Sequence, residues 1–188
     1  MNLNTVTNSY IEFNLFTKKE CKKILENINN LQFTNYSIKL GKKFYENGSS
    51  MKSQDLVDNI NTKWIFDRLK SKLSNEFDIK WILNPHGVFR YYTVGDYFLE
   101  HKDNVNKSGA DPRYFTVTVQ LSEPEEYIGG DVIVEKVNKI SKNIGSATLW
   151  GSNLIHEVKN IKKGIRNSLV FFISSKHLLF NNKATNKI

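Results

Sequence analysis

Two segments in the first half of the chain carry apolar residues at helical spacing. The first covers residues 18–29 and follows Thr17, with Glu20 three residues further on, which is the arrangement of a capping box. The second covers residues 61–77. We expect two amphipathic helices, each packed on the outside of a sheet. Their apolar positions are Cys21, Ile24, Leu25 and Ile28 in the first, and Trp64, Ile65, Leu69, Leu73 and Phe77 in the second.

From residue 79 onward the pattern changes to short β-rich runs bounded by Gly, Pro and Asn. Close to eight such runs follow one another without a helical pattern between them, which predicts a double-sheet sandwich or jelly roll rather than a parallel α/β sheet. The polar stretch 46–54 and the basic stretch 160–166 are expected to be a loop and a turn. The runs read IKWILN, GVFRYYTV, DYFLEHKD, RYFTVTVQL, GGDVIVEKV, SATLWG, IHEVKNI and RNSLVFFIS.

A chain of 188 residues, 39% of them hydrophobic, suits a single domain with a sizeable core. We expect one mainly β domain over 1–188, of the α+β type, with a helical N-terminal part of about 1–78 and a jelly-roll core of about 79–176. No apolar run is long enough to span a membrane, and no secretion signal is evident. The single cysteine suits a reducing compartment, so a cytoplasmic protein is expected. The oligomeric state is left open.

The formal net charge of +8 raises the question of a nucleic-acid partner. The basic residues are 23 lysines and only four arginines, although arginine is the residue favoured for bidentate phosphate recognition. Asparagine is equally common, at 23 residues. Lysine and asparagine enriched together indicate a compositional bias rather than a binding surface, so the composition argues against a nucleic-acid partner.

Candidate metal ligands occur at the end of the run DYFLEHKD. Residues two apart on a strand project to the same face, so His101 and Asp103 can reach one point while Lys102 faces away. A third ligand is needed, and His156 lies 55 residues downstream, where one short strand turns into the next. In an antiparallel sandwich the returning strands can bring it beside the pair. Two histidines and one carboxylate form the facial triad of non-haem Fe(II) oxygenases, which leaves three coordination positions open.

A second candidate lies ten residues beyond His156. Arg166 begins an apolar strand that is expected to be buried, and no acidic residue flanks it in sequence. Because a buried guanidinium without a partner is costly, this position favours an anionic ligand. A dicarboxylate bound to the metal at one end and to the arginine at the other would satisfy both features.

The order of these motifs resembles the Fe(II)- and 2-oxoglutarate-dependent dioxygenases, and within them the prolyl 4-hydroxylase-like branch. The resemblance covers about 85–175, and the segment FTKKECKKILE is similar to the helix that opens such domains. It implies a double-stranded β-helix, or jelly roll, of about eight core strands with N-terminal helices outside. The segments that carry it are RYYTVGDYFLEHKD, RYFTVTVQL, EEYIGGDVIV, GSATLWGSNLIHEV and KKGIR.

The resemblance also implies roles for individual residues. His101, Asp103 and His156 would bind Fe(II), and the distal carboxylate of 2-oxoglutarate would be held by Arg166. The position of Tyr92 matches a tyrosine whose hydroxyl reaches the cosubstrate. The remaining two matches are Gln120, which stands where relatives often have a tyrosine near the distal carboxylate, and Arg113, which matches an arginine that contacts the peptide substrate in the prolyl branch. By alternation Gln120 should share the inner face of its strand with Thr116 and Thr118.

The implied activity is hydroxylation of an unactivated C–H bond by O₂ and 2-oxoglutarate, with release of succinate and CO₂. The branch favours a prolyl residue of a peptide or protein, and the same chemistry on a free amino acid or other small molecule is an alternative. A nucleic-acid demethylase related to AlkB would carry a second arginine six residues after Arg166, where this chain has Phe172. A non-catalytic jelly-roll binding module is disfavoured because all three ligand positions are intact.

Overall fold

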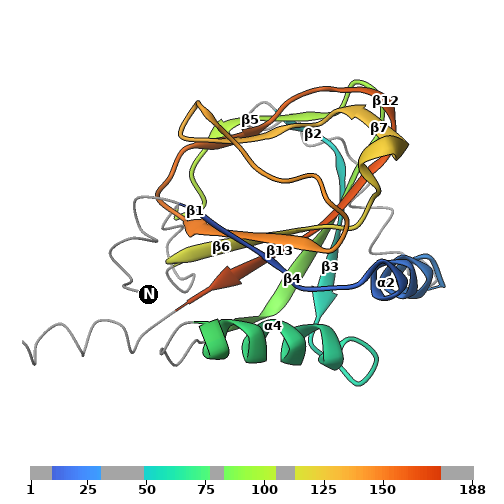
Figure 1. Ribbon diagram of the computed structural model, residues 1–188, viewed down its shortest axis with the longest axis vertical. Helices are drawn as coiled ribbons and strands as arrows, with labels where there is room; N and C mark the ends of the chain where they lie inside the picture. Colours follow the sequence, from blue (N-terminus) through green and yellow to red (C-terminus); the bar gives the residue numbers. More distant parts are fainter. Residues whose placement is uncertain (1–9, 31–48, 77–82, 105–112, 175–188) are drawn as a thin grey trace, which may run out of the picture.

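The computed structural model describes residues 10–30, 49–76, 83–104 and 113–174, and the jelly roll expected from the sequence is present (Figure 1). A six-stranded sheet faces a five-stranded sheet, and all pairings are antiparallel. A two-stranded sheet closes one end of the sandwich. Antiparallel pairing of this kind brings residues from distant parts of the sequence into register.

The six-stranded sheet has the strand order β1-β10-β6-β13-β4-β3. Every residue of β6 and of β10 is buried, because one face of these strands contacts the helices and the other faces the second sheet. The strands are β1 (Tyr10–Asn14), β3 (Lys52–Val57), β4 (Leu83–Tyr92), β6 (Phe115–Gln120), β10 (Ser146–Gly151) and β13 (Arg166–Ile173).

The five-stranded sheet has the order β2-β5-β11-β8-β9, and its strands are shorter. They are β2 (Ser49–Ser50), β5 (Tyr97–His101), β8 (Val132–Val134), β9 (Asn138–Lys139) and β11 (His156–Val158). The small sheet pairs β7 (Tyr127–Gly129) with β12 (Ile161–Gly164), and a 3₁₀ turn, η1 (Pro124–Glu126), precedes β7.

Both predicted helices are present, as α2 (Lys18–Asn30) and α4 (Lys63–Glu76). Thr17 and Glu20 form the expected capping box, in which each residue accepts a hydrogen bond from the backbone N–H of the other. The helices lie outside the six-stranded sheet (Figure 1), as predicted. Neither α-helix in the described part of the chain is long and apolar enough to cross a membrane.

The interior has two separate layers of buried side chains. One lies between the helices and the outer face of the six-stranded sheet, and includes Ile24, Leu69 and Phe171. The other lies between the two sheets, and includes Tyr92 and Trp150. The first layer is almost wholly apolar, whereas the space between the sheets also contains buried polar groups. This second space is where a polar ligand site can form.

The structure differs from the sequence prediction mainly in the first half of the chain. The part expected to be helical contributes β1 and β3, which form the two edges of the six-stranded sheet. The expected loop 46–54 and the expected turn 160–166 overlap strands β2, β3 and β12. These strands are short or polar, so their sequence carries little periodic signal, and pairing with a neighbouring strand decides them. The predicted strand at 79–84 lies mostly outside the described residues.

Candidate metal centre and anion pocket

A β-ladder brings together two of the predicted ligands. Strand β11 pairs with β5, and His156 stands directly opposite His101 in the register, although 55 residues separate them. Five strands, β6 to β10, lie between the two in sequence. As expected for an antiparallel sandwich, the chain returns after these strands and brings His156 beside His101. The ring centroids of the two histidines lie 4.2 Å apart. The register between β5 and β11 is irregular next to His156.

Asp103 lies just after the end of β5, where its backbone is fixed by the opposite sheet. Its N–H donates a 2.9 Å hydrogen bond to the carbonyl oxygen of Ser152. Its side-chain Oδ2 accepts a 2.8 Å hydrogen bond from the hydroxyl of Thr116. The Thr116 hydroxyl also lies 2.9 Å from the Ser152 hydroxyl, and because Thr116 has already donated its proton, Ser152 is the donor of this bond. The carboxylate is therefore oriented by the Thr116 hydroxyl, which is itself held by the Ser152 hydroxyl.

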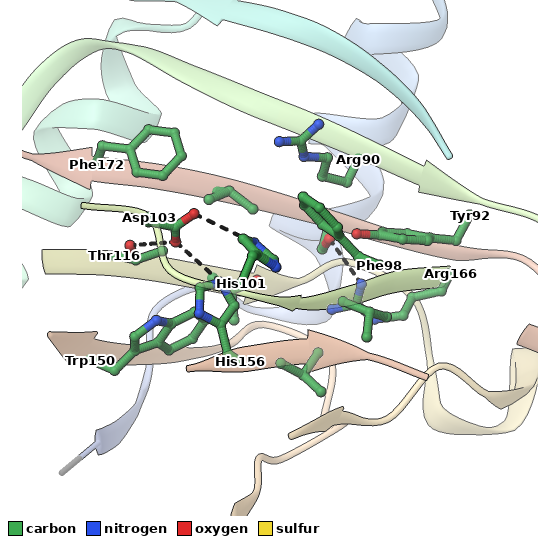
Figure 2. Close-up of a pocket in the computed structure, with 15 residues that line it drawn as sticks. Arg90, Tyr92, Phe98, His101, Asp103, Thr116, Trp150, His156, Arg166 and Phe172 are labelled. Atoms are coloured by element: carbon green, nitrogen blue, oxygen red, sulfur yellow. Dashed lines mark hydrogen bonds and ion pairs between the residues drawn. The ribbon is translucent and has the colours of Figure 1, made fainter. Parts of the chain in front are cut away.

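Both histidine rings are oriented by backbone carbonyl groups. Nδ1 of His101 lies 2.8 Å from the carbonyl oxygen of Leu99, and Nδ1 of His156 lies 3.1 Å from that of Leu154. Since a carbonyl can only accept, each Nδ1 carries a proton, and each Nε2 faces Asp103, where it donates a hydrogen bond to the carboxylate when protonated and offers a lone pair to a metal ion when not. The two Nε2 atoms lie 3.6 Å and 3.2 Å from the Asp103 carboxylate oxygens (Figure 2).

Aromatic rings cover the histidines on their other sides. Phe98 stacks on His101 with a centroid distance of 3.8 Å, and Trp150 lies 5.0 Å from the ring of His156. These contacts restrict the rotation of both imidazoles and exclude water from their faces. The three candidate ligand groups are consequently held in place by packing as well as by hydrogen bonds.

The electrostatics of the cluster favour a charged carboxylate. Burial of Asp103 acts to raise its pKa, but the hydrogen bonds and charges of the two histidines outweigh this, and the pKa lies well below its usual range. Burial acts to lower the pKa of His156, and the hydrogen bond and charge of Asp103 outweigh it, so that pKa is raised. The carboxylate thus attracts positive charge to this point, which is what a cation-binding site requires.

The donor atoms suit a transition-metal ion. One nitrogen from each histidine and one oxygen from Asp103 lie within 4.8 Å of one another. Two imidazole nitrogens and one carboxylate on one side of the ion leave the other side open for ligands and substrate. This donor set and its open face fit non-haem Fe(II).

Arg166 lies in the same pocket, alongside Tyr92 (Figure 2). It is only 1% exposed. Its Nη1 donates a 3.2 Å hydrogen bond to Ser168, its guanidinium lies 5.2 Å from the centroid of the Tyr92 ring, and its Nε has no hydrogen-bond partner. None of the carboxylates in the described ranges forms an ion pair with it. A buried guanidinium with a free donor fits a bound carboxylate.

The Gly-Gly pair before β8 explains how this arginine is accommodated. Gly129 has φ +83° and Gly130 has φ +63°, a backbone conformation that favours glycine. A Cβ on Gly129 would lie 2.1 Å from the carbonyl oxygen of Asn160, and one on Gly130 would lie 2.4 Å from Ile161 and 3.2 Å from Arg166 Cδ. Any larger residue here would displace β12 and the arginine that follows it.

The structure brings together five of the seven residues singled out from the sequence. His101, Asp103, His156, Arg166 and Tyr92 all line one pocket. Gln120 and Arg113 do not line the pocket. Gln120 is buried and its Oε1 has no hydrogen-bond partner. Arg113 lies on the ring of Phe172.

Sequence reasoning missed several residues of the pocket. Thr116 and Thr118 line it, as the alternation along β6 predicts, but the hydrogen bond from Thr116 to Asp103 was not foreseen. Ser168 and Arg90 also line it. Both could have been found by alternation, because Ser168 follows Arg166 by two residues and Arg90 precedes Tyr92 by two.

A jelly roll with a candidate metal-binding cluster of two histidines and one aspartate is the arrangement found in non-haem iron oxygenases. Comparison with known proteins agrees with this. Residues 87–174 match the 2OG-Fe(II) oxygenase superfamily. A PKHD-type hydroxylase of Prochlorococcus marinus is 29% identical over 182 residues, covering 88% of this chain and 78% of the relative. PKHD-type hydroxylases of Caulobacter and Acinetobacter match over 44% and 51% of their own length.

Solved structures agree in fold. A prolyl-4-hydroxylase of Pseudomonas putida has a TM-score of 0.67 at 14% identity and covers 89% of this chain and 92% of its own. A prolyl hydroxylase of Trichoplax adhaerens, solved with a peptide fragment of a hypoxia inducible factor, has a TM-score of 0.66 at 18% identity and covers 98% and 90%. Over residues 87–174, which contain His101, Asp103, His156 and Arg166, the chain is similar to the 2OG-Fe(II) oxygenase superfamily, and its fold is that of the solved prolyl hydroxylases. The superfamily is named for Fe(II) and 2-oxoglutarate, and the curated relatives are named hydroxylases.

Proposed function

We propose that His101, Asp103 and His156 bind Fe(II), that Arg166 binds the distal carboxylate of 2-oxoglutarate, and that the enzyme hydroxylates a prolyl residue of a peptide or protein. Tyr92 contributes to the cosubstrate pocket through its ring and hydroxyl. Arg113 contacts the substrate at the rim of the site.

The observation that carries the proposal is the buried guanidinium of Arg166, which has no acidic partner among the described residues and lies in the same pocket as the His-Asp-His cluster. A metal site alone would not require it. A dicarboxylate accounts for both the cluster and the arginine. One carboxylate can approach the open face of the metal, and the other can form an ion pair with the guanidinium.

When bound, Fe(II) and 2-oxoglutarate supply the oxidising chemistry that activates O₂ against an unactivated C–H bond. The protein supplies position and environment. Backbone carbonyls fix the tautomers of His101 and His156, and Thr116 holds the Asp103 carboxylate. Phe98 and Trp150 limit the access of water to the ligands, which protects the site from unproductive reactions.

Gln120 is expected to contribute to cosubstrate binding only indirectly. It is buried on β6, opposite Ser168 in the register between β6 and β13, yet it does not line the pocket. We propose that it acts on the cosubstrate through Ser168 and Arg166 rather than by direct contact. Its unpartnered Oε1 remains available to a hydrogen-bond donor at the closed end of the sandwich.

The prolyl substrate is supported by the names of the solved structures with the same fold and by the peptide bound to the Trichoplax enzyme. A free amino acid with the same chemistry is the alternative. A nucleic-acid demethylase is not favoured, because the position of its second arginine is occupied by Phe172, whose ring packs under Arg113. The cytoplasmic location expected from the single cysteine remains a prediction.

Metal binding is tested by titrating the purified protein with Fe(II) under nitrogen. We expect one Fe(II) per chain, and a visible absorption band when 2-oxoglutarate is added. His101→Ala should lose both, whereas His86→Ala, which removes an exposed histidine outside the pocket, should retain both. A parent protein that takes up no iron would refute the proposed metal site.

The cosubstrate role is tested by measuring the affinity for 2-oxoglutarate in the presence of Fe(II). Arg166→Ala should bind it about 100-fold more weakly, since charge-assisted hydrogen bonds are worth roughly 1.5–3 kcal/mol each. Arg166→Lys should retain part of the affinity because it keeps the charge but not the planar fork. Arg68→Ala, which removes an arginine paired with Glu20 on the helices, is the control. Unchanged affinity in Arg166→Ala would contradict the assignment.

A further inference from the structure

A second arginine lines the pocket in addition to Arg166. Arg90 lies on β4 two residues before Tyr92, and therefore on the same inner face of the strand. Its guanidinium lies 5.9 Å from the centroid of the Phe98 ring, which itself stacks on His101. Figure 2 shows Arg90 on the same side of the His-Asp-His cluster as Phe172.

A third arginine lies at Phe172. The guanidinium of Arg113 lies 3.7 Å from the centroid of the Phe172 ring, and Phe172 lines the pocket. Burial lowers the pKa of Arg113, and the charge of Arg90 lowers it further, while the charge of Asp103 acts in the opposite direction. Arg113 therefore interacts electrostatically with Arg90 and with the carboxylate of Asp103.

Neither of these arginines has an acidic partner in the part of the chain that the structure describes. Arg68, by comparison, lies 2.8 Å from the carboxylate of Glu20. Ser53, which stands opposite Arg90 on β3, is uncharged. Arg113 is exposed and Arg90 is half-buried, so Arg90 is the one for which a bound anion would supply an ionic partner that the described residues do not.

The proposed cofactor and cosubstrate do not supply this anion. The two positive charges of Fe(II) and the single charge of Arg166 are balanced by Asp103 and the two carboxylates of 2-oxoglutarate. The charges of Arg90, which lines the pocket, and of Arg113, which lies on the ring of the pocket residue Phe172, are left over.

We propose that Arg90, together with Arg113, selects substrates that carry a carboxylate next to the carbon to be hydroxylated. The inference rests on the proposed function and narrows its substrate class. Two sources offer the same group, an acidic side chain beside a proline in a peptide and the α-carboxylate of a free amino acid. In both cases Arg90 is a specificity-determining residue that touches the substrate.

The test compares probes that differ only in charge. Three blocked peptides of the form Ala-X-Pro-X-Ala carry glutamate, glutamine or lysine at both X positions, and N-acetylproline is compared with its amide. Binding to the protein with Fe(II) and 2-oxoglutarate is measured by calorimetry under nitrogen, where no turnover occurs. Succinate release in air is the second measurement. The affinity for 2-oxoglutarate is followed in every variant, so that damage to the metal site or to the fold is recognised.

We expect the parent to prefer the acidic member of at least one pair: the glutamate peptide over the glutamine peptide, or N-acetylproline over its amide. The preferred probe should bind about tenfold or more tightly, a factor that one charge-assisted hydrogen bond provides. Arg90→Gln should reduce this preference several-fold, and Arg90→Gln combined with Arg113→Gln should abolish it. Lys19→Gln, which removes an exposed charge on α2, should retain it. Added salt should weaken binding of the acidic probes more than that of the neutral ones.

Equal binding of acidic and neutral probes by the parent would overturn the inference, and so would a preference that survives in the double variant. A parent that binds none of the probes also overturns it. In each of these outcomes, tight binding of Fe(II) and 2-oxoglutarate would leave the proposed chemistry standing, whereas loss of both would refute the proposed function itself. A preference limited to the peptide or to the free amino acid identifies the source of the carboxylate.

Discussion

The Asp103 carboxylate shows how much of the proposed metal centre depends on groups outside the ligand motif. Its orientation comes from Thr116 on β6 and from Ser152 after β10, which follow it by 13 and 49 residues. Partners of this kind determine the direction and basicity of a ligand, and their loss typically weakens metal affinity 10–100-fold. The hydroxyl of Thr116 is therefore expected to matter for iron although it does not contact the metal.

Thr116→Val removes this hydroxyl while keeping the shape of the side chain. We expect the affinity for Fe(II), titrated under nitrogen, to fall by at least about tenfold, with little change in the melting temperature of the metal-free protein. Thr118→Val is the matched control, because Thr118 lies on the same face of β6 but bonds only weakly, at 3.4 Å, to the carbonyl oxygen of Leu169. If both variants bind iron like the parent, the Thr116 hydroxyl does not position the ligand.

Among individual residues, the sequence identified those whose side chains are unusual at their position in a strand. A histidine and a carboxylate at a strand end, and an arginine opening an apolar strand, stand out against the pattern around them. Thr116 and Arg90 do not, because a threonine on a strand and an arginine among aromatic residues are ordinary. Their partners come from other strands, and only the register between strands shows which groups meet.

Helix α2 illustrates an element that local sequence determines almost completely. Thr17 and Glu20 satisfy backbone groups at its first turn, and Glu20 also lies 2.8 Å from Arg68 on α4. The hydrogen bond from the backbone N–H of Thr17 is the largest influence on Glu20 and lowers its pKa, with Arg68 adding to the effect and burial opposing it. The cap should therefore stabilise the folded protein only while Glu20 is ionised.

Glu20→Gln tests this contribution through its pH dependence. Because the folded-state pKa of Glu20 is lowered, its stabilisation is present above the pKa of the unfolded chain and is lost as the pH falls through the folded-state pKa. We expect the variant to be about 0.5–1 kcal/mol less stable than the parent at pH 7, with the difference shrinking as the pH falls through the folded-state pKa of Glu20. Urea unfolding at several pH values measures it.

Glu26→Gln is the control for this experiment, since Glu26 is an exposed residue of the same helix. It makes the same change of charge without touching the cap. A difference between parent and Glu20→Gln that stays constant with pH would show that the carboxylate charge is not the cause.

The strands of the first half of the chain show where element prediction from sequence ends. Helices α2 and α4 were predicted because their hydrogen bonds are local and their apolar stripe repeats along the chain. Strands β1 and β3 were not, because each is an edge strand whose hydrogen bonds depend on a partner far away in sequence. Two-residue strands such as β9 carry no periodicity at all.

At the scale of the whole molecule, the proposed site joins elements that are otherwise connected only through the core. The ligands come from the five-stranded sheet, at the ends of β5 and β11, while Arg166 begins β13 in the six-stranded sheet. Bound Fe(II) would link β5 to β11, and 2-oxoglutarate would link the two sheets. Ligands that bind only the folded state raise the free energy of unfolding of the whole domain.

We expect Fe(II) at 100 times its dissociation constant to stabilise the protein by about 2.7 kcal/mol, which corresponds to a rise of roughly 5–10 °C in the melting temperature for a chain of this size. Addition of 2-oxoglutarate should raise it further in the parent and much less in Arg166→Ala. Calorimetry under nitrogen, with a chelator as the reference state, makes the measurement. A melting temperature that does not respond to Fe(II) would contradict the proposed link between the strands.

The amino-acid sequence by itself determined the helices, the β-rich second half, the family resemblance and the ligand residues His101, Asp103 and His156 as candidates. These features rest on local periodicity and on rare residue types at fixed spacing. Only the tertiary structure decided the edge strands, the partners of Asp103 and the placing of Arg90 beside the cluster. The physical reason is that β-sheet pairing and buried hydrogen bonds join residues far apart in the chain, and no local pattern records which ones meet.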